Sequence, residues 1–326
     1  AIDRGLQYLT SQQKLEGSPH LNDYHGSFYS NPEDQKYAIA ITSFAGLSLL
    51  ANGNVPNRGP YGTRVTHALD FILRHVNPGS GFITGNKDES RMHGHGFAVL
   101  FLAEVYGTSS SKTESRHIYE KLKKSIQLIL DAQTPDGGWG YMPLDKFHEG
   151  SITVCQLQAL RAARNVGIKV PKKSIDMAVK YLQRSANPDG SFKYRLGMSG
   201  RTPSFPLAAA GVSSLNATGE YDSKEIKNGL QFMMQYLPPG GKQDQYYRAF
   251  YYYGQFYAAQ AMYHAPSSYW EKWYPAACED LLGRQDPGGA WGKIGRGYSR
   301  FGPVYATAIA TLILQIPYNY LPIFQK

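Results

Sequence analysis

The chain has 326 residues, of which 42% are hydrophobic and 18% charged, a balance that is typical of a folded globular protein and excludes an intrinsically disordered one. Its net charge is +9, but the Lys and Arg residues are scattered and form no recognised nucleic-acid-binding motif, so we expect no nucleic-acid partner. No apolar run reaches the roughly 18 residues of a membrane span, which leaves contact with a membrane surface open.

One pattern recurs six times along the chain. Each copy has an amphipathic stretch, then a Gly-rich turn that usually carries an aromatic residue, then a stretch rich in Ala and Leu. The turns, in chain order, are Gly26–Phe28, Gly81–Phe82, Asp136–Gly140, Asp189–Phe192, Pro239–Gly241 and Pro287–Gly292. Their central glycines are 48 to 57 residues apart. Six units therefore fill residues 1–326, which we predict to be a single domain.

The two stretches of each unit predict an outer and an inner helix. In the fourth unit Ile175, Ala178, Val179 and Leu182 follow the spacing of one helix face, with charged residues between them. The second stretches are apolar on most faces, as buried helices are. They cover residues 38–50, 97–105, 154–163, 207–215 and 305–316.

The ends of the array favour a closed ring. Open solenoids need polar caps on their terminal repeats, but the last inner stretch, residues 305–316, is as apolar as the middle ones. We therefore predict an all-α fold, an α/α toroid of six helical hairpins with an inner and an outer ring of six helices each.

Three segments give the turn a recognisable form. Arg4–Leu9 followed by Gln13, then Gln133–Trp139, and then Gln285–Trp291 resemble the Gln-to-Trp repeat of the prenyltransferase and squalene-cyclase (terpene cyclase) family. In such a repeat Gln can bond exposed backbone at a helix end, and the indole covers the next turn. The resemblance implies a single-domain, bacterial-type squalene-cyclase-like toroid with an isoprenoid ligand in its central cavity.

The best-known active sites of this fold lack their residues here. The Asp-x-Asp-Asp acid of the cyclases does not occur, and the prenyltransferase zinc triad of Asp, Cys and His is also missing. The segment 250–257 has Tyr where that triad would place His. The Cys-Gly-Glu-Gln motif of thioester domains is absent too, because residues 155–158 read Cys-Gln-Leu-Gln. Whether the protein is an enzyme is therefore left open.

Two pairs of polar residues begin inner helices, whose N-termini ring one mouth of the toroid as the resemblance implies. His93 and His95 begin the second, while His148 and Glu149 begin the third. His and Glu perform acid–base chemistry, so His95, His148 and Glu149 are the candidate catalytic residues. The sequence requires no cofactor. If a zinc ion binds, the ligands on offer are His93, His95 and His148. The alternative is that these residues cap helices or fill the core.

An aromatic run predicts the wall of a ligand site. Eight of the twelve residues 246–257 are Tyr or Phe, and at helical spacing Phe250, Tyr253 and Tyr257 share a face. Such rings can hold an isoprenoid, face a cation or stack on sugars, or they can simply fill the core. Arg201 and Arg248 are candidate clamps for an acidic group. The predicted ligand-binding residues are His93, Tyr246, Phe250, Tyr253, Tyr257, Arg201 and Arg248.

The favoured function is the binding of an elongated apolar or amphipathic ligand in an aromatic-lined cavity. The alternatives are a scaffold or glycan-binding module, and a hydrolase or lyase that uses the His/Glu cluster. Cys155 and Cys278 fall in different hairpins and indicate no disulfide framework. The chain begins at Ala1 without Met, which is consistent with an exported protein whose leader is absent. Compartment and oligomeric state are left open.

Overall fold

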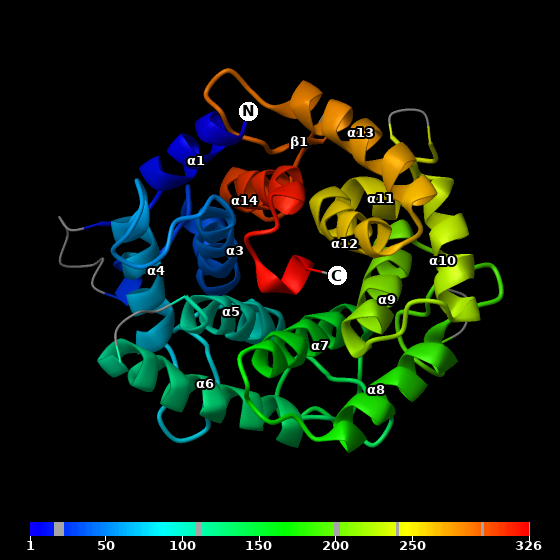
Figure 1. Cartoon of the computed structure of the whole chain (residues 1–326), viewed down its shortest axis with the longest axis horizontal. Coiled ribbons are helices and arrows are strands. Elements are labelled where there is room, and N and C mark those ends of the chain that lie inside the picture. Colours follow the sequence, from blue (N-terminus) through cyan, green and yellow to red (C-terminus); the bar gives the residue numbers. More distant parts are fainter. Residues whose placement is uncertain (16–22, 109–111, 199–202, 239–240, 295–296, 326) are drawn as a thin grey trace.

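The computed structural model describes residues 1–15, 23–108, 112–198, 203–238, 241–294 and 297–325. Its main helices form two concentric rings (Figure 1). The outer ring consists of α1 (Ile2–Ser11), α4 (Gly62–Arg74), α6 (Lys112–Asp131), α8 (Lys172–Ser185), α10 (Lys224–Met234) and α13 (Ser267–Arg284). The inner ring consists of α3 (Ala38–Ala51), α5 (Arg91–Tyr106), α7 (Gly150–Asn165), α9 (Phe205–Thr218), α12 (Tyr251–His264) and α14 (Gly302–Gln315). The predicted α/α toroid is confirmed.

Short elements complete the chain. They are α2 (Pro32–Gln35), α11 (Gln245–Ala249), the antiparallel strands β1 (Lys293–Ile294) and β2 (Gly297–Tyr298), and the 3₁₀ helices η2 (Ile316–Tyr318) and η3 (Pro322–Phe324). None of the described helices is both long and apolar enough to cross a membrane.

Burial follows the two kinds of stretch in the sequence. Every residue of α3 is buried, because its polar members are small hydroxyl residues that bond within the helix or to a neighbour. By contrast, α8 buries only Ala178, Tyr181, Leu182 and Ser185, which form one stripe. The inner ring is therefore the core, and the outer helices cover it with one face each.

In three of the six repeats, a glutamine side chain links the turn to the next outer helix. The side-chain amides of Gln13, Gln133 and Gln285 each donate to the carbonyl of a glycine in their own turn, at 2.9–3.0 Å. Each also donates, at 2.9 Å, to a carbonyl near the start of the next outer helix. For Gln285 that acceptor is Ala1, so the same contact that joins neighbouring repeats also joins the last repeat to the first.

The inner ring closes through α14 and α3. The hydroxyl groups of Ser48 and Thr311 lie 2.6 Å apart, and the side chain of Gln315 donates to the carbonyl of Ser48 at 3.2 Å. All three residues are buried. The predicted packing of the sixth repeat against the first is confirmed, and a closed ring has no exposed end repeat.

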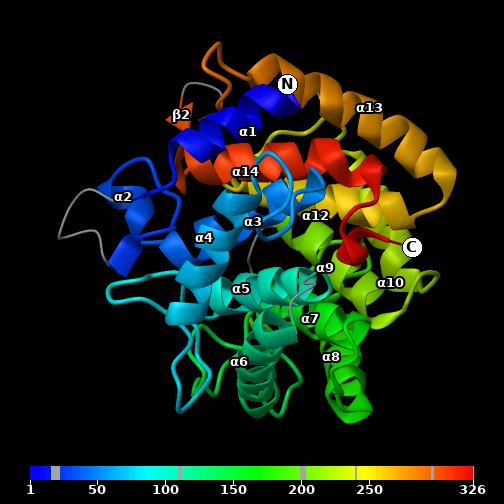
Figure 2. The same cartoon turned by 60° about the vertical axis from the view of Figure 1, so that its left-hand side comes forward.

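The C-terminal segment closes one end of the ring. Figure 1 shows η3 and the chain end inside the inner ring, and Figure 2 shows α14 leading into this segment. The ring of Phe324 packs edge-on against Phe256, and the backbone N–H of Ile323 donates to the buried carboxyl group of Glu104. Arg161 donates to the carbonyl of Gln325 at 3.2 Å. This segment leaves the opposite mouth, where the inner helices begin, uncovered.

Candidate ligand-binding site

A cavity of about 410 Å³ lies at the N-terminal mouth of the inner ring. The residue that caps the N-terminus of each of the six inner helices lines it. These caps are Tyr37, Ser90, Glu149, Ser204, Phe250 and Phe301. First-turn residues of the same helices add to the wall, and residues from loops, from α11 and from the second turn of α5 complete it.

The wall has two unlike halves. The caps of α12, α14 and α3, which are neighbours in the ring, are aromatic, and the first turns of α12 and α14 add Tyr253 and Tyr305. The caps of α5, α7 and α9 are Ser or Glu, and the first turns of α5 and α7 add His93 and Ser151. The wall is therefore more aromatic on the side of α12, α14 and α3. Its small polar residues gather on the side of α5, α7 and α9, where Phe97, Pro206 and Leu207 also line the cavity.

Side chains packed in layers fill the ring below the cavity. On α7 and α12, the sulfur of Cys155 lies 3.6 Å from the hydroxyl oxygen of Tyr257. About one turn further along both helices, Gln158 donates to the side-chain oxygen of Gln260 at 2.7 Å. All four side chains are buried. The cavity is thus a pocket with a floor and not a channel through the ring.

Glu149, Ser151 and His93 form a hydrogen-bonded chain in the polar half. Glu149 is fully buried and accepts bonds from the backbone N–H groups of Ser151 (2.9 Å) and Ile152 (3.2 Å), which makes it the cap of α7. The Ser151 hydroxyl oxygen lies 2.5 Å from Glu149 Oε2 and 3.0 Å from His93 Nε2. Burial lowers the pKa of His93 to about 4, so the ring is neutral at physiological pH.

Tyr141 and Tyr194 join two repeats at the rim. Their hydroxyl oxygens lie 2.6 Å apart, and both residues line the cavity. Each stands two positions after the aromatic residue of its turn, Trp139 or Phe192. Sequence reasoning did not identify them, but the shared offset in two repeats was the pattern that could have done so.

His95 does not face the cavity. Its ring is fully buried, and both nitrogens bond to backbone: Nδ1 accepts the N–H of Ile83 at 3.1 Å, and Nε2 donates to the carbonyl of Ser125 at 3.1 Å. Burial lowers its pKa to about 4. Thr153 and Thr307 accept the corresponding turn N–H in other repeats. His95 is thus held in a structural bond, which leaves neither nitrogen for catalysis.

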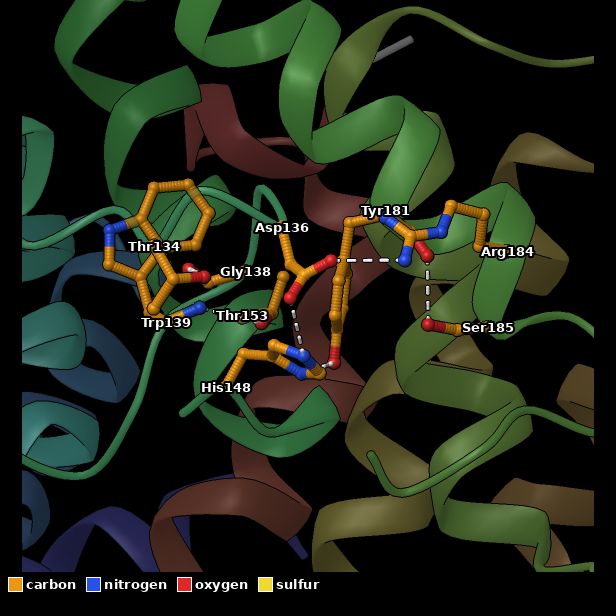
Figure 3. Close-up of polar contacts among 9 residues, drawn as sticks. All are labelled: Thr134, Asp136, Gly138, Trp139, His148, Thr153, Tyr181, Arg184 and Ser185. Carbon is orange, nitrogen blue, oxygen red and sulfur yellow. Dashed lines mark hydrogen bonds and ion pairs between the residues drawn. The ribbon is translucent and has the colours of Figure 1, made fainter. Parts of the chain in front are cut away.

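His148 also lies away from the cavity wall. Figure 3 shows it between Asp136 and Tyr181. Its Nδ1 is 3.2 Å from the Tyr181 hydroxyl and its Nε2 is 3.5 Å from Asp136 Oδ2. The other oxygen of Asp136 pairs with Arg184 at 3.0 Å. Burial lowers the pKa of His148, and Asp136 opposes that shift. This network fastens the third turn to α8. Of the three candidate catalytic residues, only Glu149 reaches the cavity.

The aromatic run is divided between two helices. The backbone of Phe250 is not helical, and it separates α11 from α12. Of the predicted ligand-binding residues, His93, Tyr246, Phe250 and Tyr253 line the cavity, whereas Tyr257 is fully buried beneath it. Phe250 is the N-cap of α12, and its carbonyl accepts the N–H of Gly254 at 2.8 Å.

Of the two arginines predicted to bind an acidic group, the structure describes one. Arg248 is not part of the cavity wall, and its guanidinium donates to the carbonyl of Gln243 at 2.8 Å. Arg201 lies outside the described residues. Within the described part of the chain, no three His, Cys, Asp or Glu side chains come together as a metal site, and the three histidines proposed as ligands each have separate partners.

No family model matches the sequence, and no curated protein matches it either. Solved structures do. The type II terpene cyclase MstE from Scytonema aligns with a TM-score of 0.65 at 14% identity, over 98% of this chain and 97% of that one. The GH76A α-1,6-mannanase from Salegentibacter sp. HEL1_6 gives 0.66 at 9% identity over 96% and 97%. A protein from Actinoplanes gives 0.62 at 15% identity over 96% and 97%. These likenesses show a terpene-cyclase-like α/α-toroid fold.

Proposed function

We propose that the protein binds an isoprenoid, or a ligand with a similar elongated apolar body, at the N-terminal mouth of its inner ring. The observation that supports this best is the composition of the cavity wall, in which nine of the twenty lining residues are Tyr or Phe. Aromatic rings offer large apolar contact areas with little loss of side-chain freedom. The volume of about 410 Å³ lies within the range of small-molecule sites.

Proteins of the same fold are known with two ligand classes. MstE has been solved with geranylgeranyl dihydroxybenzoate, and the mannanase with an α-1,6-mannotetraose. A sugar chain needs polar partners along its whole length, because each buried hydroxyl must be bonded. Here the aromatic caps of α3, α12 and α14 make half of the wall apolar. An apolar body with a polar end suits this wall better than a glycan does.

Replacing Ala40 by Trp is expected to block the site. Ala40 is in the first turn of α3, on the aromatic half, and lines the cavity. An indole there occupies space that the ligand would fill, so the dissociation constant for farnesol should rise at least about ten-fold. Isothermal titration calorimetry measures this. Leu144→Trp adds the same ring at a side chain that is 93% exposed and should leave binding unchanged.

Two other results would reject the isoprenoid proposal. Binding of a mannan oligosaccharide that Ala40→Trp abolishes, with no binding of farnesol, would make the protein a glycan-binding module. Binding of neither ligand, with a normal circular dichroism spectrum, would favour a scaffold.

A further inference from the structure

We infer that the cavity recognises its ligand by an uncharged hydroxyl head group, which donates a hydrogen bond to His93. This inference rests on the proposed function and adds a direction and a head-group chemistry to it. The apolar body lies against α3, α12 and α14, and the hydroxyl group points toward α5 and α7.

The direction follows from the two halves of the wall. An amphipathic ligand buries most apolar surface when its body contacts the aromatic half, formed around Tyr37, Phe250 and Phe301. Its polar end must then find a hydrogen-bonding partner, because a buried polar group without one is unfavourable. Such partners lie on the opposite side, where α5 and α7 present His93 and Ser151.

The hydrogen bonds determine which nitrogen of His93 carries the proton. Two backbone N–H groups, those of Ser151 and Ile152, donate to the carboxyl group of Glu149. The Ser151 hydroxyl also donates to this carboxyl group, with 2.5 Å between the two oxygen atoms. The single hydroxyl proton of Ser151 is then used. Its oxygen accepts from His93, whose Nε2 at 3.0 Å must be the protonated nitrogen.

His93 is left with one acceptor. In the neutral ring, Nδ1 carries a lone pair, and this atom has no hydrogen-bond partner among the residues that the structure describes. The low pKa of His93, about 4, keeps the ring neutral. Because the ring lines the cavity, Nδ1 is the acceptor it offers to a ligand. Tyr253 lines the same cavity, and its buried hydroxyl also lacks a partner in the described structure, so it provides a second polar contact for a hydroxyl group.

The charges at this mouth oppose an anionic head group. Helix N-termini normally attract anions. Here the chain's own carboxyl groups occupy two of the six: Glu149 caps α7, and Asp88 accepts the N–H of Ile39 at the start of α3. Glu89 adds a further carboxylate to the wall, whereas Arg300, which is exposed, is the one cation among its described residues. A diphosphate would therefore meet more negative than positive charge.

The test compares three ligands that share one hydrocarbon chain: farnesol, farnesyl methyl ether and farnesyl diphosphate. The ether keeps the oxygen but cannot donate a hydrogen bond. We expect the protein to bind farnesol about five- to ten-fold more tightly than the ether, because the ether lacks one hydrogen bond to the protein. Farnesol should also bind at least about ten-fold more tightly than the diphosphate. In His93→Phe the difference between alcohol and ether should disappear while the affinity for the ether is kept. His117→Phe, at an exposed position on α6, should retain the difference.

The outcomes separate this inference from the proposed function. Equal affinity for alcohol and ether, tightest binding of the diphosphate, or an unchanged preference in His93→Phe would overturn the hydroxyl inference alone. Failure of all three ligands to bind the wild-type protein would overturn the proposed function. If His93→Phe does not fold, Ser151→Ala replaces it. This variant removes the acceptor that holds Nε2 of His93 protonated, so it should weaken the preference for farnesol over the ether. An unchanged preference in Ser151→Ala would also overturn the inference.

Discussion

Replacement of Glu104 by Gln is expected to stabilise the protein by roughly 3–5 kcal/mol at pH 9, and to leave its stability at pH 4 nearly unchanged. Glu104 lies on α5 beside the C-terminal segment and is 4% exposed. One carboxyl oxygen accepts the N–H of Ile323 at 3.2 Å, and the other is buried without a partner among the described residues. Burial raises the pKa of Glu104 from 4.5 to about 8, and the bond from Ile323 opposes this shift.

The sign follows from the proton balance. Between these two pKa values the folded protein holds a proton on Glu104 that the unfolded chain has lost. The free energy of unfolding therefore falls as pH rises through this interval, by about 1.4 kcal/mol for each unit, and the stability is fully present only below the unfolded value. Gln has nearly the shape of protonated Glu and does not ionise, so the variant should lose this dependence.

The measurement is chemical denaturation of both proteins at pH 4, 7 and 9. Other groups titrate over this range, but they do so in both proteins and cancel in the difference between the two curves. Glu120→Gln, at an exposed position of α6, is the matched control and should follow the wild-type curve. Parallel curves for Glu104→Gln and the wild-type protein would show that Glu104 is ionised in the fold at neutral pH.

The architecture could be predicted because the same helical hairpin occurs six times in the closed ring, and each copy has the same requirements for burial and for chain reversal. Each unit needs a buried helix, a helix with one apolar stripe, and a turn that returns the chain, and each need leaves its own pattern in composition. The identity of the turn glycine was less accessible. The third turn contains Gly137, Gly138 and Gly140, which the sequence does not distinguish, and in the structure Gly137 is the one with positive φ.

The site was predicted only in part, because its residues come from loops as well as helices. His93, Tyr246, Phe250 and Tyr253 were found from chemistry and local spacing. Whether a histidine faces the cavity or the turn depends on a shift of two positions along α5, which separates His93 from His95. Aligning the repeats resolves this, since His95 accepts the same backbone bond as a threonine does in other units.

The position of Phe250 at the mouth of the cavity could not be predicted from helical spacing, because the chain forms two helices in this region. Asp244 accepts bonds from the next backbone N–H groups and so starts the separate short helix α11. The change of direction at Phe250 then places this ring at the mouth, where Tyr37 and Phe301 hold the equivalent cap positions. A continuous helix through residues 246–257 would have lacked this cap.

Gly137→Ala is expected to destabilise the protein by more than about 3 kcal/mol, whereas Gly167→Ala should cost only about 1–2 kcal/mol. Both glycines have positive φ, +97° and +82°, which costs a residue with a Cβ atom the same strain. They differ in their surroundings. A Cβ atom on Gly137 would lie 2.2 Å from the carbonyl oxygen of Met177 on α8, whereas one on Gly167 would meet no heavy atom within 4 Å in the described structure.

The pair therefore separates backbone strain from the contact that joins neighbouring repeats. The clash at Gly137 is with backbone, so α8 itself must move away, and the bonds from Gln133 to the turn and to α8 must lengthen with it. Denaturant unfolding of both variants, followed by circular dichroism, measures the difference. Equal losses would mean that the turn and α8 shift apart at little cost. A much larger loss at Gly137 would show that close approach between each turn and the next outer helix holds the ring together, and Gly26, Gly190 and Gly289, which face a carbonyl in the same way, should then behave alike.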